Sequence, residues 1–314
     1  MPSLSSPSSS PSPSSSLPSA PSRLARDAVV TALRAAGCVF AEDEARLILA
    51  AAGTPDELAA MVDRRVTGLP LELVLGWAEF RGLRIAVEPG VFVPRRRTEF
   101  LVEQALAHAL DASVVVDLCC GSGAVGAALA AALGPVELHA ADIDPAAVRC
   151  ARRNVAPFGG QVHTGDLFGA LPDTLRGRIG ILAANVPYVP TDEVGLLPAE
   201  ARDHEPHVAL DGGPDGLDVL RRVAAEASRW LAPGGCLLIE TSERQAPTAL
   251  EAFTRSGLSS RLIVSEEPYV AVVVGLNHAD RQGQSEPPRR FSKDSPAVPH
   301  GGAPPINQAA GHGR

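Results

Sequence analysis

Four polar side chains stand where hydrophobic stretches of this sequence end. They are Asp117, Asp142, Asp166 and Asn185, and each follows a segment that predicts a buried strand. In an open parallel sheet a ligand binds outside the carboxyl ends of the strands, so these side chains are expected to converge on one site. Carboxylates there can hold a cation or a ribose hydroxyl, and an amide can hold a polar substrate group.

A loop of small residues follows the first of these carboxylates and runs into an Ala-rich helical sequence. The loop is Cys119-Cys120-Gly121-Ser122-Gly123, and its glycines let the backbone approach a ligand that a Cβ would keep away. Asp117 would repel a pyrophosphate but attract the ammonium of an amino-acid group beside a sulfonium. With Gly126 the loop also matches the dinucleotide fingerprint, in which Asp142 would bind a ribose hydroxyl. The loop alone therefore leaves a dinucleotide and S-adenosylmethionine (SAM) both open.

The composition restricts the class of protein and its partners. The chain has 314 residues and a formal net charge of −8, which argues against a stable nucleic-acid partner held by its phosphates. No apolar stretch is long enough to span a bilayer, so no membrane association is expected. Five cysteines without a Cys-x-x-Cys spacing predict no disulfide framework, no metal cluster and a reducing, cytoplasmic location.

Changes in composition divide the chain into five parts. Residues 1–21 are almost all Ser and Pro and predict a disordered extension, and residues 277–314 predict a disordered tail. Between them we expect a three-helix substrate-recognition domain at 22–70, with Thr54-Pro55 starting the third helix. A hairpin linker is expected at 71–97 and a SAM-dependent methyltransferase domain at 98–276. A packing appendage is the alternative interpretation of the helical part.

Strands and helices alternate after residue 98. Predicted strands at 114–118, 136–141, 179–184 and 236–240, one near 162, and helices at 98–110, 145–154, 216–231 and 246–253 indicate a parallel sheet covered on both faces. The last two predicted strands, 262–266 and 269–275, are separated by Glu267-Pro268. That link is too short for a parallel crossover, so they should pair antiparallel at the sheet edge. The predicted fold is α/β: a Rossmann-like, seven-stranded sheet of the class I SAM-dependent methyltransferase type, rather than a dehydrogenase.

The segment Asn185-Val186-Pro187-Tyr188 resembles the Asn-Pro-Pro-Tyr motif of the HemK/PrmC family, the protein-(glutamine-N5) methyltransferases of peptide-chain release factors. The resemblance covers roughly residues 24–275. Its further motifs, in order, are Phe92-Val93-Pro94-Arg95 with Thr98-Glu99, Asp117-Leu118 with Gly121-Ser122-Gly123-Ala124, Asp142-Ile143-Asp144-Pro145, Gly165-Asp166-Leu167-Phe168, Glu205-Pro206, Ala209-Leu210-Asp211-Gly212-Gly213 with Asp215-Gly216-Leu217, and Pro233-Gly234-Gly235.

The resemblance implies SAM as the cofactor and a release-factor glutamine as the substrate. It assigns cofactor contacts to Asp117, Cys119, Cys120, Gly121, Ser122 and Gly123 at the methionine end, Asp142 at the ribose, Asp166 and Leu167 at the adenine, and Asn185. It assigns the catalytic role to Asn185, Val186, Pro187 and Tyr188. An amide nitrogen is a poor nucleophile, but two carbonyl acceptors can fix its two N–H groups and orient it for in-line methyl transfer. Tyr188 would form an aromatic wall beside the planar amide.

Three departures from the family pattern stand out. Val186 replaces the first proline, although its backbone carbonyl is retained and Pro187 still favours an extended conformation. Arg95-Arg96-Arg97 replaces Arg-Pro-Glu, which predicts either an altered macromolecular partner or a solvated basic loop. Glu240-Thr241-Ser242 stands in place of Glu-x-Gly, which puts a backbone bend in question.

Three other functions stay open at this point. A nucleic-acid adenine N6-methyltransferase uses a similar motif, and the three arginines favour it while the net charge opposes it. A SAM-binding protein without catalysis is supported by Val186. A nicotinamide oxidoreductase is supported by Gly126 and opposed by Asp117.

Overall fold

A computed structural model describes residues 23–108, 112–266 and 269–278 of the chain. The extension predicted at residues 1–21 lies outside them, as does nearly all of the tail predicted at 277–314. The described part of the chain begins with four α-helices and a two-stranded antiparallel sheet: α1 (Arg23–Ala35), α2 (Ala41–Ala51), α3 (Pro55–Val66), α4 (Leu71–Leu75), β1 (Trp77–Phe80) and β2 (Leu83–Ala86). The predicted hairpin is confirmed by the β1–β2 pairing.

Local chemistry accounts for the first helices. Thr54 caps α3 by accepting a hydrogen bond from the Glu57 N–H at 3.1 Å, and Pro55 occupies the first turn, as predicted. Leu33 of α1 and Ile48 of α2 are fully buried in a small core of their own. Helix α4 was not predicted, because five residues are too few to give a helical periodicity.

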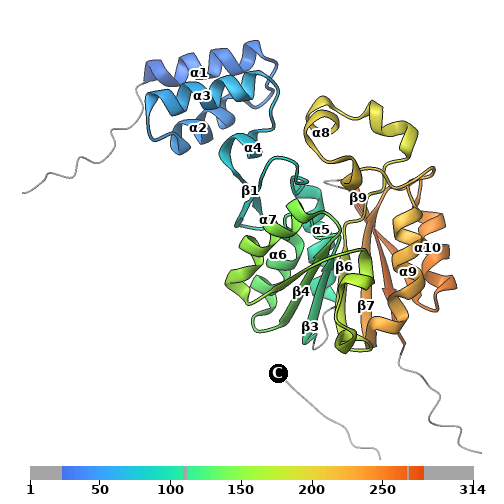
Figure 1. Cartoon of the computed structure of the whole chain (residues 1–314). Helices are drawn as coiled ribbons and strands as arrows, with labels where there is room; N and C mark the ends of the chain where they lie inside the picture. The colour runs from blue at the N-terminus through green and yellow to red at the C-terminus, as the bar shows by residue number, and fades with distance from the viewer. Residues whose placement is uncertain (1–22, 109–111, 267–268, 279–314) are drawn as a thin grey trace, which may run out of the picture. The chain divides into compact units, whose positions relative to one another are not determined.

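The rest of the described chain is built on a seven-stranded sheet with helices around it (Figure 1). Its strands are β3 (Val114–Leu118), β4 (Glu137–Asp142), β5 (Gln161–Thr164), β6 (Ile179–Ala184), β7 (Leu231–Thr241), β8 (Ser259–Glu266) and β9 (Tyr269–Leu276). The order β5-β4-β3-β6-β7-β9-β8 is parallel from β5 to β7, and β9 pairs antiparallel with both β7 and β8. The predicted fold class and its antiparallel edge hairpin are therefore confirmed.

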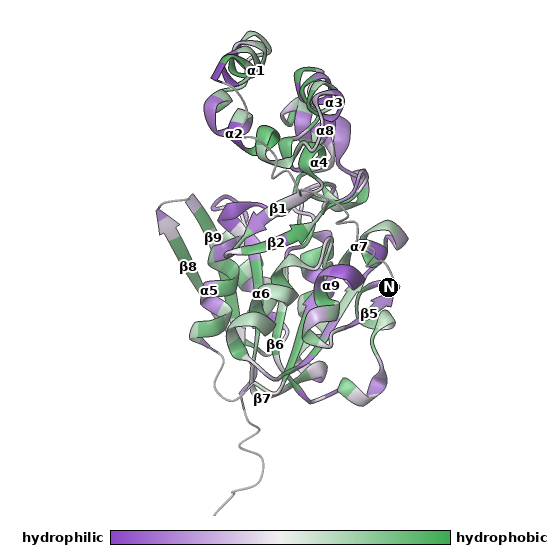
Figure 2. Cartoon of the chain, turned by 90° about the vertical axis from the view of Figure 1, so that its left-hand side faces the viewer, coloured by the Kyte–Doolittle hydropathy of each residue, from purple (hydrophilic) through white to green (hydrophobic). Residues whose placement is uncertain are grey.

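Helices cover both faces of this sheet (Figure 1). One face carries α5 (Glu99–Ala107), α6 (Ala124–Leu133) and α7 (Pro145–Val155), and the other carries α9 (Asp218–Trp230) and α10 (Ala246–Arg255). A short helix, α8 (Ala199–His204), was not predicted, because it belongs to the long segment between β6 and α9. Figure 2 shows the sheet largely in the green of hydrophobic residues, as expected for strands buried on both faces.

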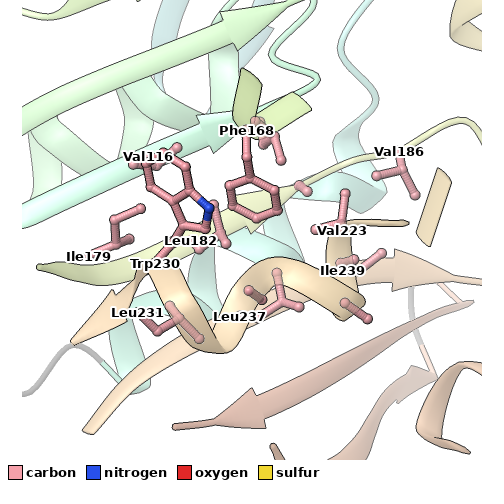
Figure 3. Close-up of a cluster of buried hydrophobic side chains, with 14 of the residues drawn as sticks. Val116, Phe168, Ile179, Leu182, Val186, Val223, Trp230, Leu231, Leu237 and Ile239 are labelled. Carbon is pink, nitrogen blue, oxygen red and sulfur yellow. The ribbon is translucent and has the colours of Figure 1, made fainter. Parts of the chain in front are cut away.

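The core under α9 is built around two stacked aromatic rings (Figure 3). Phe168 and Trp230 stack with ring centroids 5.3 Å apart and an interplanar angle of 18°, and Trp230 is 1% exposed. Val186, from the loop after β6, belongs to the same buried cluster. This packing anchors the predicted catalytic loop in a close-packed core.

Candidate active site

A cavity of about 880 Å³ lies at the carboxyl ends of the parallel strands. Asp117, Asp142, Asp166 and Asn185 all line it, so the predicted convergence of four strand ends on one site is realised. The other predicted site residues that line it are Cys119, Cys120, Gly121, Ser122, Leu167, Val186, Pro187 and Tyr188. The volume is at the upper end of the range for small-molecule sites, which leaves room for a cofactor and a substrate side chain together.

Gly123 is the one predicted cofactor residue that does not line the cavity. It stands before the first residue of α6 with φ +77°, and a Cβ there would lie 3.1 Å from Ala151 Cβ and Val155 Cγ1. Its glycine therefore serves the packing of the loop against α7. Gly126 has a similar explanation, because its Cβ would lie 3.1 Å from the Asp117 Cβ. Close packing therefore explains why glycines stand at these two positions of the dinucleotide fingerprint.

Asp117 is a buried carboxylate at the end of β3. It is 1% exposed, and its Oδ2 accepts a hydrogen bond of 2.8 Å from the Gly126 N–H. Burial raises the pKa of Asp117 to about 8, and the nearby carboxylate of Asp142 adds to the rise. A buried carboxylate that lacks a cation favours binding of a positively charged group.

Asp142 ties the end of β4 to the glycine loop. Its Oδ2 accepts from the Gly121 N–H at 2.8 Å and its Oδ1 from the Asp144 N–H at 2.9 Å. Asp144 caps α7 by accepting a hydrogen bond from the Ala146 N–H. Burial raises the pKa of Asp142. Because each carboxylate oxygen accepts more than one hydrogen bond, Asp142 keeps acceptor capacity for a hydroxyl in the cavity.

Asp166 has a partner that the sequence does not reveal. Arg222, on the first turns of α9, donates a hydrogen bond of 2.5 Å from Nη2 to Asp166 Oδ2, and both residues line the cavity. Leu167 beside it has φ +48°, a conformation that costs energy in a residue with a Cβ. The pair Asp166–Arg222 and the strained Leu167 form one end of the cavity.

Two carbonyl oxygens of the predicted catalytic loop, residues 185–188, have no hydrogen-bond partner within the described residues. Asn185 donates from Nδ2 to Thr98 Oγ1 at 3.4 Å, while its Oδ1 is enclosed without a partner. The Val186 carbonyl oxygen is likewise free of donors in the described chain. Enclosed acceptors without donors are uncommon in native proteins. These two oxygens, on adjacent residues, fit the two N–H groups of a primary amide.

Val186 directs its side chain away from this chemistry. The residue is 1% exposed and packs in the core with Val223 and Ile239 (Figure 3). The departure from the family's proline therefore changes a core contact and leaves the backbone acceptor in place.

The stretch from Leu210 to Leu217 forms the base of the loop. The Val189 N–H donates to the Leu210 carbonyl at 3.0 Å, and the Gly212 N–H donates to the Val189 carbonyl at 2.8 Å. Gly216 lies so close that a Cβ there would be 2.2 Å from the Tyr188 carbonyl oxygen. Gln245 Nε2 donates to that same oxygen at 2.8 Å. The glycines of this stretch thus allow a close approach that holds Tyr188.

The arginine run is exposed at Arg96 and Arg97, and two of its members also form ion pairs with buried carboxylates. Arg95 donates to the buried Glu205 at 2.5 Å, and Arg97 donates to the buried Glu240 at 3.1 Å. Glu205 also accepts from the Val93 N–H at 3.2 Å, so the Phe-Val-Pro-Arg and Glu-Pro motifs are joined. The third departure from the family pattern places Ser242 where the family has glycine. The Ser242 carbonyl oxygen accepts a hydrogen bond of 3.1 Å from the Gln245 N–H.

Together, this sheet order and a cavity lined by acidic strand ends define a class I SAM-dependent methyltransferase. The residues fit the cofactor. The buried carboxyl of Asp117 would pair with its ammonium in the ionised form, and Asp142 would offer acceptors for its ribose. Gly121, with φ +53° and only Phe92 Cβ near its missing side chain at 3.9 Å, leaves room for close approach.

Comparison with known proteins narrows this class. The Methyltransferase small domain model matches residues 82–181. The release factor glutamine methyltransferase of Geobacter sulfurreducens is 39% identical over 226 residues, covering 70% of this chain and 78% of that protein. That of Mycolicibacterium smegmatis is 39% identical over 221 residues, covering 68% and 78%. A 4-amino-L-phenylalanine/4-methylamino-L-phenylalanine methyltransferase of Streptomyces pristinaespiralis is 36% identical over 205 residues, covering 62% and 69%.

The chain therefore belongs to the release factor glutamine methyltransferase family. Within the described residues no three His, Cys, Asp or Glu side chains gather to hold a metal ion. No helix in the described ranges is long and apolar enough to cross a membrane. Sequence reasoning missed Arg222, Gln245 and the side-chain contact of Thr98, because each reaches the site from a distant element.

Proposed function

We propose that this protein transfers the methyl group of SAM to the side-chain nitrogen of a protein glutamine, the Gly-Gly-Gln glutamine of a peptide-chain release factor. The observation that carries the proposal is the pair of unpartnered acceptors, Asn185 Oδ1 and the Val186 carbonyl oxygen, in the lining of one cavity. The family relationship supports the substrate.

The work of the loop is to orient the substrate nitrogen. Asn185 Oδ1 and the Val186 carbonyl each accept one N–H of the glutamine amide, which fixes the plane of the amide. SAM, when bound by the residues named above, would supply an electrophilic methyl group. The N–C bond forms as the S–C bond breaks, the thioether product leaves, and the amide nitrogen gives up one of its two protons. Positioning of this kind contributes up to about 7–11 kcal/mol to lowering a barrier, more than one general base supplies.

Thr98 and Tyr188 support this orientation. The Thr98 hydroxyl accepts from Asn185 Nδ2 at 3.4 Å, so the donor end of the Asn185 amide points to Thr98 and its acceptor end is left for the substrate. Tyr188 lines the cavity next to both acceptors and its ring limits the amide to a planar slot.

The structure offers no support for the alternative of a SAM-binding protein without catalysis. It depended on Val186, whose side chain lies in the core while its carbonyl remains available. The adenine alternative depended on the arginine run, two members of which are paired with buried carboxylates. A cytoplasmic location remains part of the proposal and agrees with five free cysteines.

The test uses purified protein, methyl-labelled SAM and a release factor. The matched control is the same factor with its Gly-Gly-Gln glutamine changed to alanine. Label on the first factor alone supports the proposal. Label on neither factor, when SAM still binds, refutes it, and equal label on both factors places the transfer on another residue.

A further inference from the structure

Arg97 differs from its two neighbours in what it contacts. Arg95 pairs with Glu205, and Arg96 and Arg97 are both exposed, but Arg97 also contacts Tyr188 of the predicted catalytic loop and Glu240 of β7. Its Nη2 donates to the Tyr188 hydroxyl at 2.6 Å and its Nε donates to Glu240 Oε1 at 3.1 Å. The contact to Tyr188 is as short as a charge-assisted hydrogen bond.

The three side chains close a ring of hydrogen bonds. The Tyr188 hydroxyl donates in turn to Glu240 Oε1 at 3.2 Å, so the phenol accepts from Arg97 and donates to Glu240. The Glu240 side chain is 1% exposed, and Arg97 is the cation that compensates it. Burial and Glu240 together raise the pKa of Tyr188 to about 12, so the phenol remains a donor at neutral pH.

Tyr188 is thereby held at both ends. Gln245 Nε2 donates to its backbone carbonyl at 2.8 Å, while Arg97 and Glu240 hold its hydroxyl. The next residue along from Arg97 is Thr98, which accepts from Asn185 Nδ2. Consecutive residues of one short 3-10 turn, Arg96–Thr98, therefore contact the first and last side chains of the catalytic tetrapeptide.

We propose that Arg97 is a positioning residue that holds the Tyr188 ring at the wall of the amide-binding slot by fixing its hydroxyl against Glu240. The proposal rests on the proposed function, because the slot is the one that receives the glutamine amide. Arg97 then acts on the rate of transfer through Tyr188 and does not itself bind the protein substrate.

Steady-state methylation of a release factor separates these roles. We expect Arg97→Gln to lower kcat about tenfold because the ring loses its fixed orientation, and to change KM for the factor less than about twofold. Arg96→Gln, the exposed neighbour, is the matched control and should leave both constants unchanged. A raised KM with unchanged kcat would mean that Arg97 touches the protein substrate and would overturn the proposal.

A double-mutant cycle tests the route of the effect. In a Tyr188→Phe background, which lacks the hydroxyl, Arg97→Gln should lower kcat by less than about twofold further. The same tenfold loss in that background would refute an action through Tyr188. Because Arg97→Gln leaves Glu240 without a cation, Arg97→Gln/Glu240→Gln removes both charges. We expect this variant to regain thermal stability without regaining kcat. Full recovery of kcat would mean that Arg97 only neutralises the charge of Glu240 and does not position Tyr188.

A spectroscopic readout is independent of any substrate. The chain has two tyrosines, so protein labelled with ¹³C at tyrosine Cζ gives two signals, and Tyr269→Phe assigns them. We expect Arg97→Gln to move the Tyr188 signal and Arg96→Gln to leave it in place. An unmoved signal overturns the proposal. If the wild-type protein labels no release factor, the proposed function fails, and this signal alone then decides whether Arg97 holds Tyr188.

Discussion

The buried Asp117 predicts how cofactor binding depends on pH. Its carboxylate has no cation in the structure described, and burial raises its pKa to about 8. We propose that the ammonium of SAM pairs with the ionised carboxylate, so that binding requires Asp117 to lose its proton. Asp117→Asn keeps the shape and an acceptor for the Gly126 N–H but removes the charge, which makes it the matched perturbation.

The size of the effect follows from two titrations. With a pKa of about 8, Asp117 is about 3% ionised at pH 6.5 and about 24% ionised at pH 7.5. An α-amino group with a pKa of about 7.8 is about 95% and about 67% protonated at these values. The product of the two fractions rises about fivefold, so SAM affinity should rise about fivefold from pH 6.5 to pH 7.5.

Isothermal titration calorimetry at both pH values, in two buffers of different ionisation enthalpy, measures the affinity and the protons released. The wild-type protein should release protons on binding at pH 6.5, and Asp117→Asn should bind SAM at least about tenfold more weakly with no such rise between the two values. Equal affinity of the wild-type protein at the two pH values would mean that Asp117 does not meet the ammonium of SAM.

The same group has an opposite effect on stability. Its pKa is raised from 3.8 to about 8 in the folded protein, so its contribution to the free energy of unfolding is complete below pH 3.8 and is lost as the pH rises through about 8. Asp117→Asn should therefore raise Tm relative to the wild-type protein at pH 8 while weakening SAM binding. A lower Tm at pH 8 would show that the charge is compensated by the fold itself.

Three further predictions concern the loop and the core. Asn185→Ala should lower kcat about 10²–10³-fold with SAM affinity nearly unchanged, because one oriented acceptor is lost; a loss confined to SAM binding would contradict the role assigned. Gly216→Ala should lower kcat about 10²-fold, since its Cβ would lie 2.2 Å from the Tyr188 carbonyl; Gly195→Ala, where a Cβ meets nothing within 4 Å, is the control and should be neutral. Trp230→Ala should reduce the free energy of unfolding by about 3–5 kcal/mol in urea denaturation, because it removes a ring that stacks on Phe168; a loss under about 1 kcal/mol would contradict a tightly packed core there.

Much of the parallel sheet could be predicted because its signals are local. Hydrophobic runs placed β3 and β6, and the two-residue link before Tyr269 required the antiparallel pairing of β8 and β9. The convergence of the four polar strand ends followed from the same topology. The short helices α4 and α8 were not predicted, because five and six residues are too few to show a helical periodicity.

The contacts between loops could not be predicted, because side chains from distant parts of the chain make them. Arg97 and Glu240 are 143 residues apart, and no charge pattern along the sequence joins them. The spacing of Gly123 predicts a cofactor contact, and the structure adds a packing role against α7 that the spacing does not reveal. Val186 was identified as a departure, but its burial in the core depends on the fold around it.

The most direct test of the account is to locate the transferred methyl group. A release factor incubated with the protein and SAM is digested, and the peptide that contains Gly-Gly-Gln is fragmented in a mass spectrometer. We expect one added methyl group on the side-chain amide nitrogen of that glutamine. The Asn185→Ala protein should leave that nitrogen unmethylated. A methyl group on any other residue, or an unmodified peptide from an incubation in which SAM binding is intact, would contradict it.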